Sequence, residues 1–176
     1  MKGEAITYHL CKDIMRLDPD LENLWIEVKG RNKNHSYLVA SIYQPKSDPA
    51  SKDVFIDQLE TILAQINNIW NGPIIIGGDT NIDTLKYSPQ KERYYSMLEQ
   101  FGIRNVVVKP TRLGKSSIDH LLTNIPRKVS HTDVIPSETV SDHDSPYMLI
   151  NIKAEMFAPR YKYIRDYKHF NESIYI

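Results

Sequence analysis

The sequence predicts an α/β fold in which strands outnumber helices. Several short runs are rich in β-branched and aromatic residues, which is typical of strands. Two longer segments repeat apolar residues at the spacing of a helix. One further run, residues 73–78, is apolar almost throughout and is bounded by glycine, as in a strand that is buried on both faces.

The first predicted elements are two strands and a helix. Residues 24–28 and 36–43 are rich in β-branched and aromatic side chains, and the polar residues 29–35 between them indicate a turn, so a β-hairpin is expected. A helix is predicted over residues 51–70, where apolar side chains keep helical spacing until Gly72 and the following proline end it.

The second half of the chain continues the alternation. After the apolar strand, residues 88–101 predict a helix with Pro89 in its first turn and Gly102 as its C-cap. Further strands are expected over residues 105–108, 118–123, 129–135 and 147–152.

Length and composition favour one domain with its own core. The chain has 176 residues, of which 41% are hydrophobic, and its 22 basic and 22 acidic residues give a formal net charge of zero. Strong non-specific binding of nucleic acid usually requires a basic excess, so a weak binder or a metal-assisted phosphate site is expected instead. Cys11 is the single cysteine, which excludes an intramolecular disulfide. No apolar run suits a signal peptide or a membrane span, so an intracellular protein without a membrane partner is predicted.

A change in composition after Pro159 suggests two parts. Residues 1–158 are predicted to form the domain, and residues 159–176 form an aromatic and basic tail. A linker towards another domain is the favoured interpretation of this tail, because linkers are commonly polar. Binding of single-stranded nucleic acid through charge and stacking is the alternative.

The first polar cluster follows the apolar strand. Asp79 and Asn81 are two positions apart and face the same side if the backbone stays extended. The preceding Gly77 and Gly78 allow a close approach of backbone or substrate. A simple turn after a buried strand is the alternative. A calcium loop is excluded, because Thr84 and Gln90 replace its glycine and glutamate.

Two further clusters contain acids and histidines. Asp119 lies in an apolar run, where an acid is costly unless it is paired. Asp142 and His143 precede the last predicted strand, and a polar turn is the alternative there. A zinc site of His120, His143 and nearby carboxylates is also open, although its spacing is not specific. Together the clusters supply what phosphodiester hydrolysis needs: a group that positions water, a cation site and a group that stabilises charge.

In their order along the chain, these motifs resemble the endonuclease/exonuclease/phosphatase superfamily. The motifs that carry the resemblance are Gly78-Asp79-Thr80-Asn81, Ser117-Ile118-Asp119-His120 and Ser141-Asp142-His143. The flanking segments, residues 41–45, 109–112, 118–124 and 163–167, resemble the endonuclease domain of LINE-type non-LTR retrotransposons and its connection to the reverse transcriptase. The resemblance implies a DNase I-like sandwich of two mixed β-sheets flanked by helices.

The resemblance also implies catalytic roles. Asp79 would orient or deprotonate the attacking water, and Asn81 would hold a phosphate oxygen. His143 would stabilise the phosphorane or act as acid and base. Asp119 would orient the imidazole of His143, as carboxylates do for other catalytic histidines.

Three more residues receive roles from the resemblance. Tyr43 would approach the leaving oxygen, Thr111 would touch the DNA backbone, and Asp142 would help to bind Mg²⁺, with Mn²⁺ as an alternative. The family begins with strands that carry an asparagine and a metal-binding glutamate. Residues 1–8 resemble a later family strand, and Glu4 does not replace that glutamate. A domain that is incomplete at its N-terminus and impaired in activity is therefore expected.

The function implied is metal-dependent hydrolysis of phosphodiesters, most specifically the DNA-nicking endonuclease of a retrotransposon. DNA and an originally fused reverse-transcriptase domain are the expected partners, and action on genomic DNA would require a nuclear location. A non-catalytic remnant of a mobile element and a phosphatase of the same superfamily are the alternatives.

Overall fold

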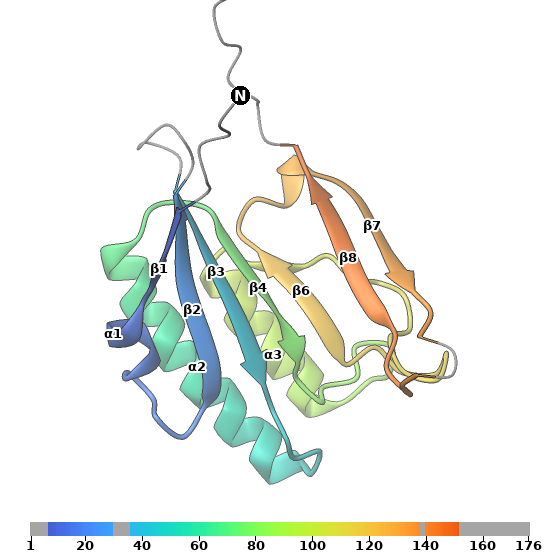
Figure 1. Ribbon diagram of the computed structural model, residues 1–176. Helices are drawn as coiled ribbons and strands as arrows, with labels where there is room; N and C mark the ends of the chain where they lie inside the picture. Colours follow the sequence, from blue (N-terminus) through green and yellow to red (C-terminus); the bar gives the residue numbers. More distant parts are fainter. Residues whose placement is uncertain (1–6, 30–35, 138–139, 152–176) are drawn as a thin grey trace, which may run out of the picture.

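A computed structural model describes residues 7–29, 36–137 and 140–151 (Figure 1). Its strands form a six-stranded mixed sheet in the order β1-β2-β3-β4-β6-β5 and a two-stranded antiparallel sheet, β7-β8. The first sheet contains β1 (Thr7–Leu10), β2 (Glu22–Lys29), β3 (Ser36–Tyr43), β4 (Ile74–Asp79), β5 (Arg104–Asn105) and β6 (Asp119–Thr123). The second contains β7 (Val129–Ile135) and β8 (Ser145–Ile150), and β8 lies beside β6.

The helices are α1 (Lys12–Met15), α2 (Pro49–Ile69), α3 (Pro89–Gln100) and the short 3₁₀ helix η1 (Pro126–Lys128). The two long helices, α2 and α3, each begin after a residue whose side chain caps them. The Asp48 side chain accepts the N–H of Ser51 at the start of α2, and Ser88 accepts the N–H of Lys91 at the start of α3. Gly102 follows α3 with a φ of 65°, a conformation that glycine adopts without strain.

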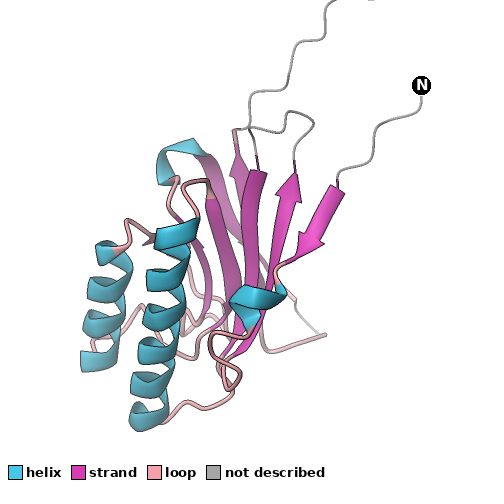
Figure 2. Ribbon diagram, turned by 90° about the vertical axis from the view of Figure 1, so that its left-hand side faces the viewer, coloured by secondary structure: helices cyan, strands magenta, loops and turns pink. Residues whose placement is uncertain are grey.

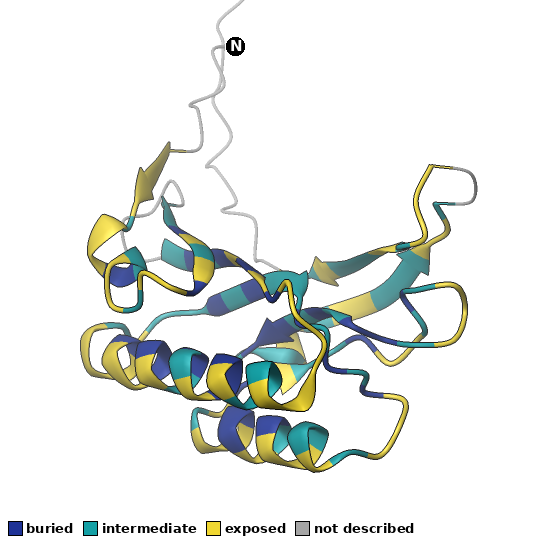
Figure 3. Ribbon diagram, turned by 90° about the horizontal axis from the view of Figure 1, so that it is seen from below, coloured by how far each residue is buried: buried dark blue, intermediate teal, exposed yellow. Residues whose placement is uncertain are grey.

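The core lies between the six-stranded sheet and the helices α2 and α3, which cover the same face (Figure 2). Phe55, Ile62 and Ile66 of α2 are fully buried, as are Trp25 and Ile76 of the sheet. The inward sides of both helices are buried and their outward sides exposed (Figure 3). Each such side chain contributes about 1.5–3 kcal/mol on burial, so this layer fixes the sheet's position.

The centre of the sheet brings the acidic strand ends together. Strand β4 pairs with β3 in parallel and with β6 in antiparallel orientation, so that Tyr43, Asp79 and Asp119 occupy one row of the register. Gly78 permits this close packing: a Cβ at that position would lie 1.8 Å from the backbone oxygen of Ile42. Because any other residue would collide with β3, the glycine before Asp79 is a structural requirement.

The predicted α/β class with two β-sheets and flanking helices is confirmed, with local differences. The strand expected over residues 105–108 ends at Asn105, because the Asn105 side chain accepts the N–H of Val107 and turns the backbone. The last strand starts at Ser145 and ends at Ile150, and the short helix α1 was not predicted. Residues 159–176 and Glu4 lie outside the described residues.

Candidate active site

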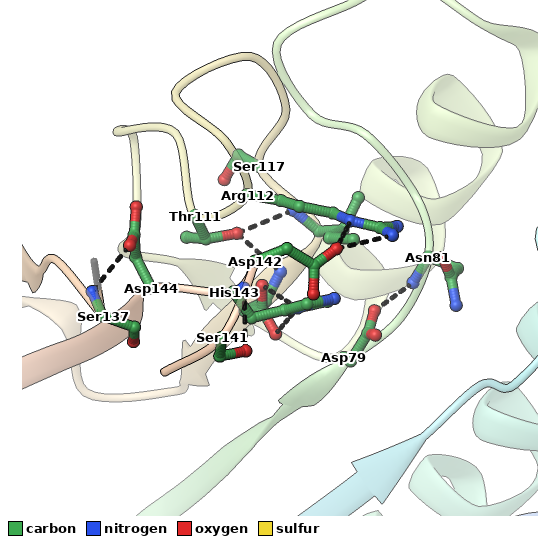
Figure 4. A network of polar contacts seen from close by, with 12 residues as sticks. Asp79, Asn81, Thr111, Arg112, Ser117, Ser137, Ser141, Asp142, His143 and Asp144 are labelled. Atoms are coloured by element: carbon green, nitrogen blue, oxygen red, sulfur yellow. Dashed lines mark hydrogen bonds and ion pairs between the residues drawn. The ribbon is translucent and has the colours of Figure 1, made fainter. Parts of the chain in front are cut away.

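Asp79, Asp119 and His143 come together beyond the ends of β4 and β6. One potential ligand atom from each lies within 4.8 Å of those of the other two, and all three residues are partly buried. Asp79 and Asp119 are direct partners in the β4–β6 register, whereas His143 comes from the segment before β8 (Figure 4). The pairing of the strands therefore creates a compact group from residues that are 64 positions apart in the chain.

The imidazole of His143 is held by Asp119. Its Nδ1 lies 3.1 Å from both carboxylate oxygens, and the backbone N–H of His143 donates to Ser141 Oγ at 3.0 Å. A carboxylate only accepts hydrogen bonds, so Nδ1 carries the proton in this contact. Nε2 has no hydrogen-bond partner among the described residues, and the side chain keeps 29% of its surface exposed. The ring nitrogen that a substrate would meet is thus accessible.

Asp79 is a carboxylate in an unfavourable environment. Burial raises its pKa above the ordinary value, and the negative charge of Asp119 adds to the rise, although its hydrogen bond from the N–H of Asn81 (2.9 Å) acts in the opposite direction. Two neighbouring carboxylates that lack a contacting Lys or Arg in the described part of the chain are suited to a divalent cation. Mg²⁺ takes oxygen ligands of this kind, commonly from one or two carboxylates.

Asn81 and Tyr43 lie beside this group. Asn81 has a φ of 51°, which asparagine tolerates better than most residues. Its Nδ2 donates to the backbone oxygen of Gln44 at 2.6 Å, which turns the carboxamide nitrogen towards the chain that follows β3. Tyr43 is 44% exposed at the end of β3. Tyr43 is the register partner of Asp79, and the roles of Asn81 and Tyr43 stay predictions.

Asp142, the expected metal ligand, is paired with Arg112. Nε and Nη2 of Arg112 both lie 2.9 Å from Oδ2 of Asp142. The hydrogen bond from this guanidinium lowers the pKa of Asp142 below its ordinary value. Asp142 is not a member of the three-residue group, and its role in metal binding stays a prediction. No role for Arg112 is predicted from the sequence, where its only signal is its place in the segment of residues 109–112.

Thr111 is buried rather than presented to a ligand. Its exposed fraction is 0%, and its Oγ1 accepts the backbone N–H groups of Ile118 (3.1 Å) and Asp119 (3.0 Å). The hydroxyl therefore fixes the start of β6 and with it the position of Asp119. A contact between Thr111 and DNA stays a prediction, and this conformation does not favour it.

His120 lies on the other side of β6 and belongs to the core. Its Nε2 is 3.2 Å from the backbone oxygen of Ser117, and its Nδ1 is close to Thr80 Oγ1 (3.1 Å) and Tyr94 OH (3.2 Å). Burial lowers the pKa of His120 to about 4. Since His120 is not part of the ligand group that contains His143, the structure does not bring the residues of the alternative zinc site together.

Comparisons with known proteins identify the family of the chain. The model of the endonuclease–reverse transcriptase family matches residues 37–147, which is more than half of the chain. No curated protein sequence matches the chain. Within the described residues, no helix is long and apolar enough to cross a membrane.

Solved structures share the fold at low sequence identity. The endonuclease domain of TRAS1, a telomere-specific non-LTR retrotransposon, is similar with a TM-score of 0.64 and 12% identity over 88% of this chain and 73% of that one. The AP endonuclease LMAP from Leishmania major is similar with a TM-score of 0.62 and 10% identity, over 74% of this chain and 54% of that one. A mannosyl-6-phosphatase from Bacteroides thetaiotaomicron is similar with a TM-score of 0.54 and 14% identity, over 74% of this chain and 57% of that one. The chain thus spans little more than half the length of the latter two. It belongs to the endonuclease–reverse transcriptase family of the endonuclease/exonuclease/phosphatase superfamily.

Proposed function

We propose that this chain is the DNA-nicking endonuclease domain of a non-LTR retrotransposon and hydrolyses phosphodiester bonds with the help of Mg²⁺ or Mn²⁺. The observation that supports the proposal most directly is the group of Asp79, Asp119 and His143, whose ligand atoms lie within 4.8 Å of one another. The similarity to the TRAS1 endonuclease domain supports DNA as the substrate and a reverse transcriptase as the fused partner. Action on chromosomal DNA would take place in the nucleus.

The proposed reaction is attack by water on phosphorus, with cleavage of the bond to the leaving oxygen. Asp79 orients the water and accepts its proton, a task for which a raised carboxyl pKa is favourable. His143, held through Nδ1 by Asp119, directs Nε2 at the phosphate and stabilises the charge that develops there. Asn81 and Tyr43 border the phosphate and the leaving oxygen.

A divalent cation would supply neutralisation of the phosphate charge. Asp79 and Asp119 offer carboxylate oxygens for it, and Asp142 retains Oδ1, which makes no hydrogen bond to any described residue. Because no more than one or two carboxylates commonly hold Mg²⁺, the remaining positions would be filled by water and substrate.

The test is nicking of supercoiled plasmid by the purified chain in millimolar Mg²⁺, in Mn²⁺ and in EDTA. The expected result is nicking that needs the cation and disappears in His143→Ala. Nicking that persists in His143→Ala or in EDTA would contradict the proposal. Release of phosphate from a soluble phosphomonoester without nicking would favour the phosphatase alternative, and neither activity would favour a non-catalytic remnant.

A further inference from the structure

Arg112 is held in a rigid position beside the catalytic group. It opens a tight turn in which Leu113 and Gly114 have φ values of 48° and 63°, and its N–H donates to the oxygen of Ser116 at 3.0 Å. This turn is tied to the segment of His143: Leu113 N–H donates to the oxygen of Asp142 at 3.2 Å, and Arg112 forms an isolated bridge with His143. The backbone therefore fixes where the arginine side chain can reach.

The guanidinium of Arg112 keeps donors available. A guanidinium has five N–H groups, and the two contacts with Asp142 both end on the single oxygen Oδ2, from Nε and from Nη2. Nη1 has no partner in the part of the chain that the structure describes, and 41% of the side chain is exposed. In Figure 4 the side chain extends past Asp142 towards the side on which Asp79 and Asn81 lie. Arg112 can thus bind an anion without leaving Asp142.

The carboxylates around the site repel an anionic substrate, so a cation such as Arg112 is needed to bind it. Asp79, Asp119 and Asp142 place three carboxylates at or next to the reacting centre, and they repel a phosphodiester. Thr111, the neighbour expected to contact the DNA backbone, is fully buried. The exposed arginine next to it has the geometry and the charge for that contact.

We propose that Arg112 binds a non-bridging oxygen of the substrate phosphate, and that its ion pair with Asp142 orients the guanidinium for this contact. The inference rests on the proposed function and adds to it the residue that receives the phosphate. Arginine is suited to the task because its planar donors match phosphate oxygens and hold them in a defined direction.

The test measures binding without cleavage. A short fluorescein-labelled DNA duplex is titrated with the full chain in EDTA at several NaCl concentrations and followed by fluorescence anisotropy. Arg112→Ala should weaken binding about 10- to 100-fold, as expected for a hydrogen bond to a charged group, and should lower the salt slope by about one. The affinity of Arg112→Lys for the duplex should lie between those of the wild-type chain and Arg112→Ala, since lysine keeps the charge but loses the planar donors.

Two further variants separate this role from others. Lys115→Ala removes an exposed cation of the same turn and should change binding less than about threefold, as for a weakly placed surface charge. Asp142→Asn keeps the positive charge of Arg112 but removes the partner that orients its guanidinium, so in EDTA it should weaken duplex binding by less than Arg112→Ala does. Asp142→Asn as weak as Arg112→Ala would mean that the arginine only orders Asp142, which overturns the proposal. Equal losses in Lys115→Ala and Arg112→Ala overturn it as well.

A second probe, inorganic phosphate followed by ³¹P line broadening, distinguishes this inference from the proposed function. Phosphate binding that depends on Arg112, without duplex binding, supports the inference and contradicts the DNA substrate. Duplex binding that is equal in wild type and Arg112→Ala, with unchanged thermal unfolding, overturns the inference alone. Binding of neither probe by the wild-type chain overturns both.

Discussion

His143, which contacts Asp119, and His120, which follows Asp119 in the chain, differ in burial and in hydrogen-bond partners. His143 is partly exposed, has one carboxylate partner and keeps Nε2 accessible. His120 is buried, and both of its ring nitrogens are occupied by protein partners. Because successive residues of a strand point to opposite faces, Asp119 faces the site while His120 faces α3. Burial and partners, rather than residue type, therefore decide which imidazole can take part in chemistry.

The buried histidine nevertheless supports the exposed site. His120 contacts Thr80, which stands between Asp79 and Asn81, and the N–H of Thr80 donates to the oxygen of Ile118 at 2.9 Å. Tyr94 of α3 completes this network through its hydroxyl. The chain after β4 is thus anchored to the core immediately next to the carboxylate of Asp79. Replacement of His143 should therefore lower activity, whereas replacement of His120 should lower the free energy of unfolding.

The largest effect is expected for catalysis. His143→Ala should lower the rate of metal-dependent nicking by about 10²- to 10⁴-fold, the usual contribution of a positioned acid–base group. Its free energy of unfolding should change by no more than about 1 kcal/mol, because the ion pair with Asp119 is partly exposed. Plasmid nicking and urea unfolding of the same preparation test this. If His143→Ala lowered the free energy of unfolding by as much as it destabilises the transition state, His143 would be a structural residue like His120.

His120→Ala is expected to act on stability. It removes a buried ring and leaves Tyr94 OH without its partner, which should lower the free energy of unfolding by about 2–4 kcal/mol. Urea unfolding at neutral pH measures the loss, with His131→Ala as a control because His131 is exposed. Unchanged stability in His120→Ala would show that the buried network contributes nothing.

The dependence of stability on pH should reveal the buried environment of His120. The pKa of His120 is about 4 in the folded protein and 6.5 in its ordinary environment. The neutral form is therefore favoured by folding: its stabilisation is complete above pH 6.5 and is lost as the pH falls towards 4, by roughly 3 kcal/mol in total. Stability curves of wild type and His120→Gln should converge over this interval. Stability curves that stay parallel over this interval would contradict the lowered pKa of His120.

The smallest effect on stability is expected at Asp79. Because burial raises the pKa of this carboxyl in the folded state, its charged form opposes folding, and this cost disappears as the pH falls through the folded-state pKa. Asp79→Asn removes the charge and should increase thermal stability slightly at pH 7 while abolishing nicking. Asp79→Ala controls for loss of the hydrogen bond from Asn81. A lower melting temperature of Asp79→Asn would mean that the carboxylate is stabilised by contacts other than those described.

The sequence by itself determined most of the helices and strands and the chemical groups that the site would use. Helix α2 follows from apolar residues such as Phe55 and Ile62 at helical spacing, and β4 from its continuous apolar run. Ordered motifs that contain Asp79, Asp119 and His143 indicated the superfamily, and Asp119 stood out because an acid in an apolar run is costly unless it is paired. Such signals are local, so they can be found without knowledge of the fold. Where a local turn competed, at Asn105, the strand prediction was wrong.

Only the tertiary structure decided how these residues are used. The sequence left open a zinc site that combined His120 with His143, and the pairing of β4 with β6 places Asp119 at the site and His120 in the core. It likewise gave no sign that Arg112 would contact Asp142 across 30 residues, or that Thr111 would be buried by β6. Partners, burial and accessible donors depend on which distant segments pack together. They are therefore set by strand pairing and packing, which no local pattern encodes.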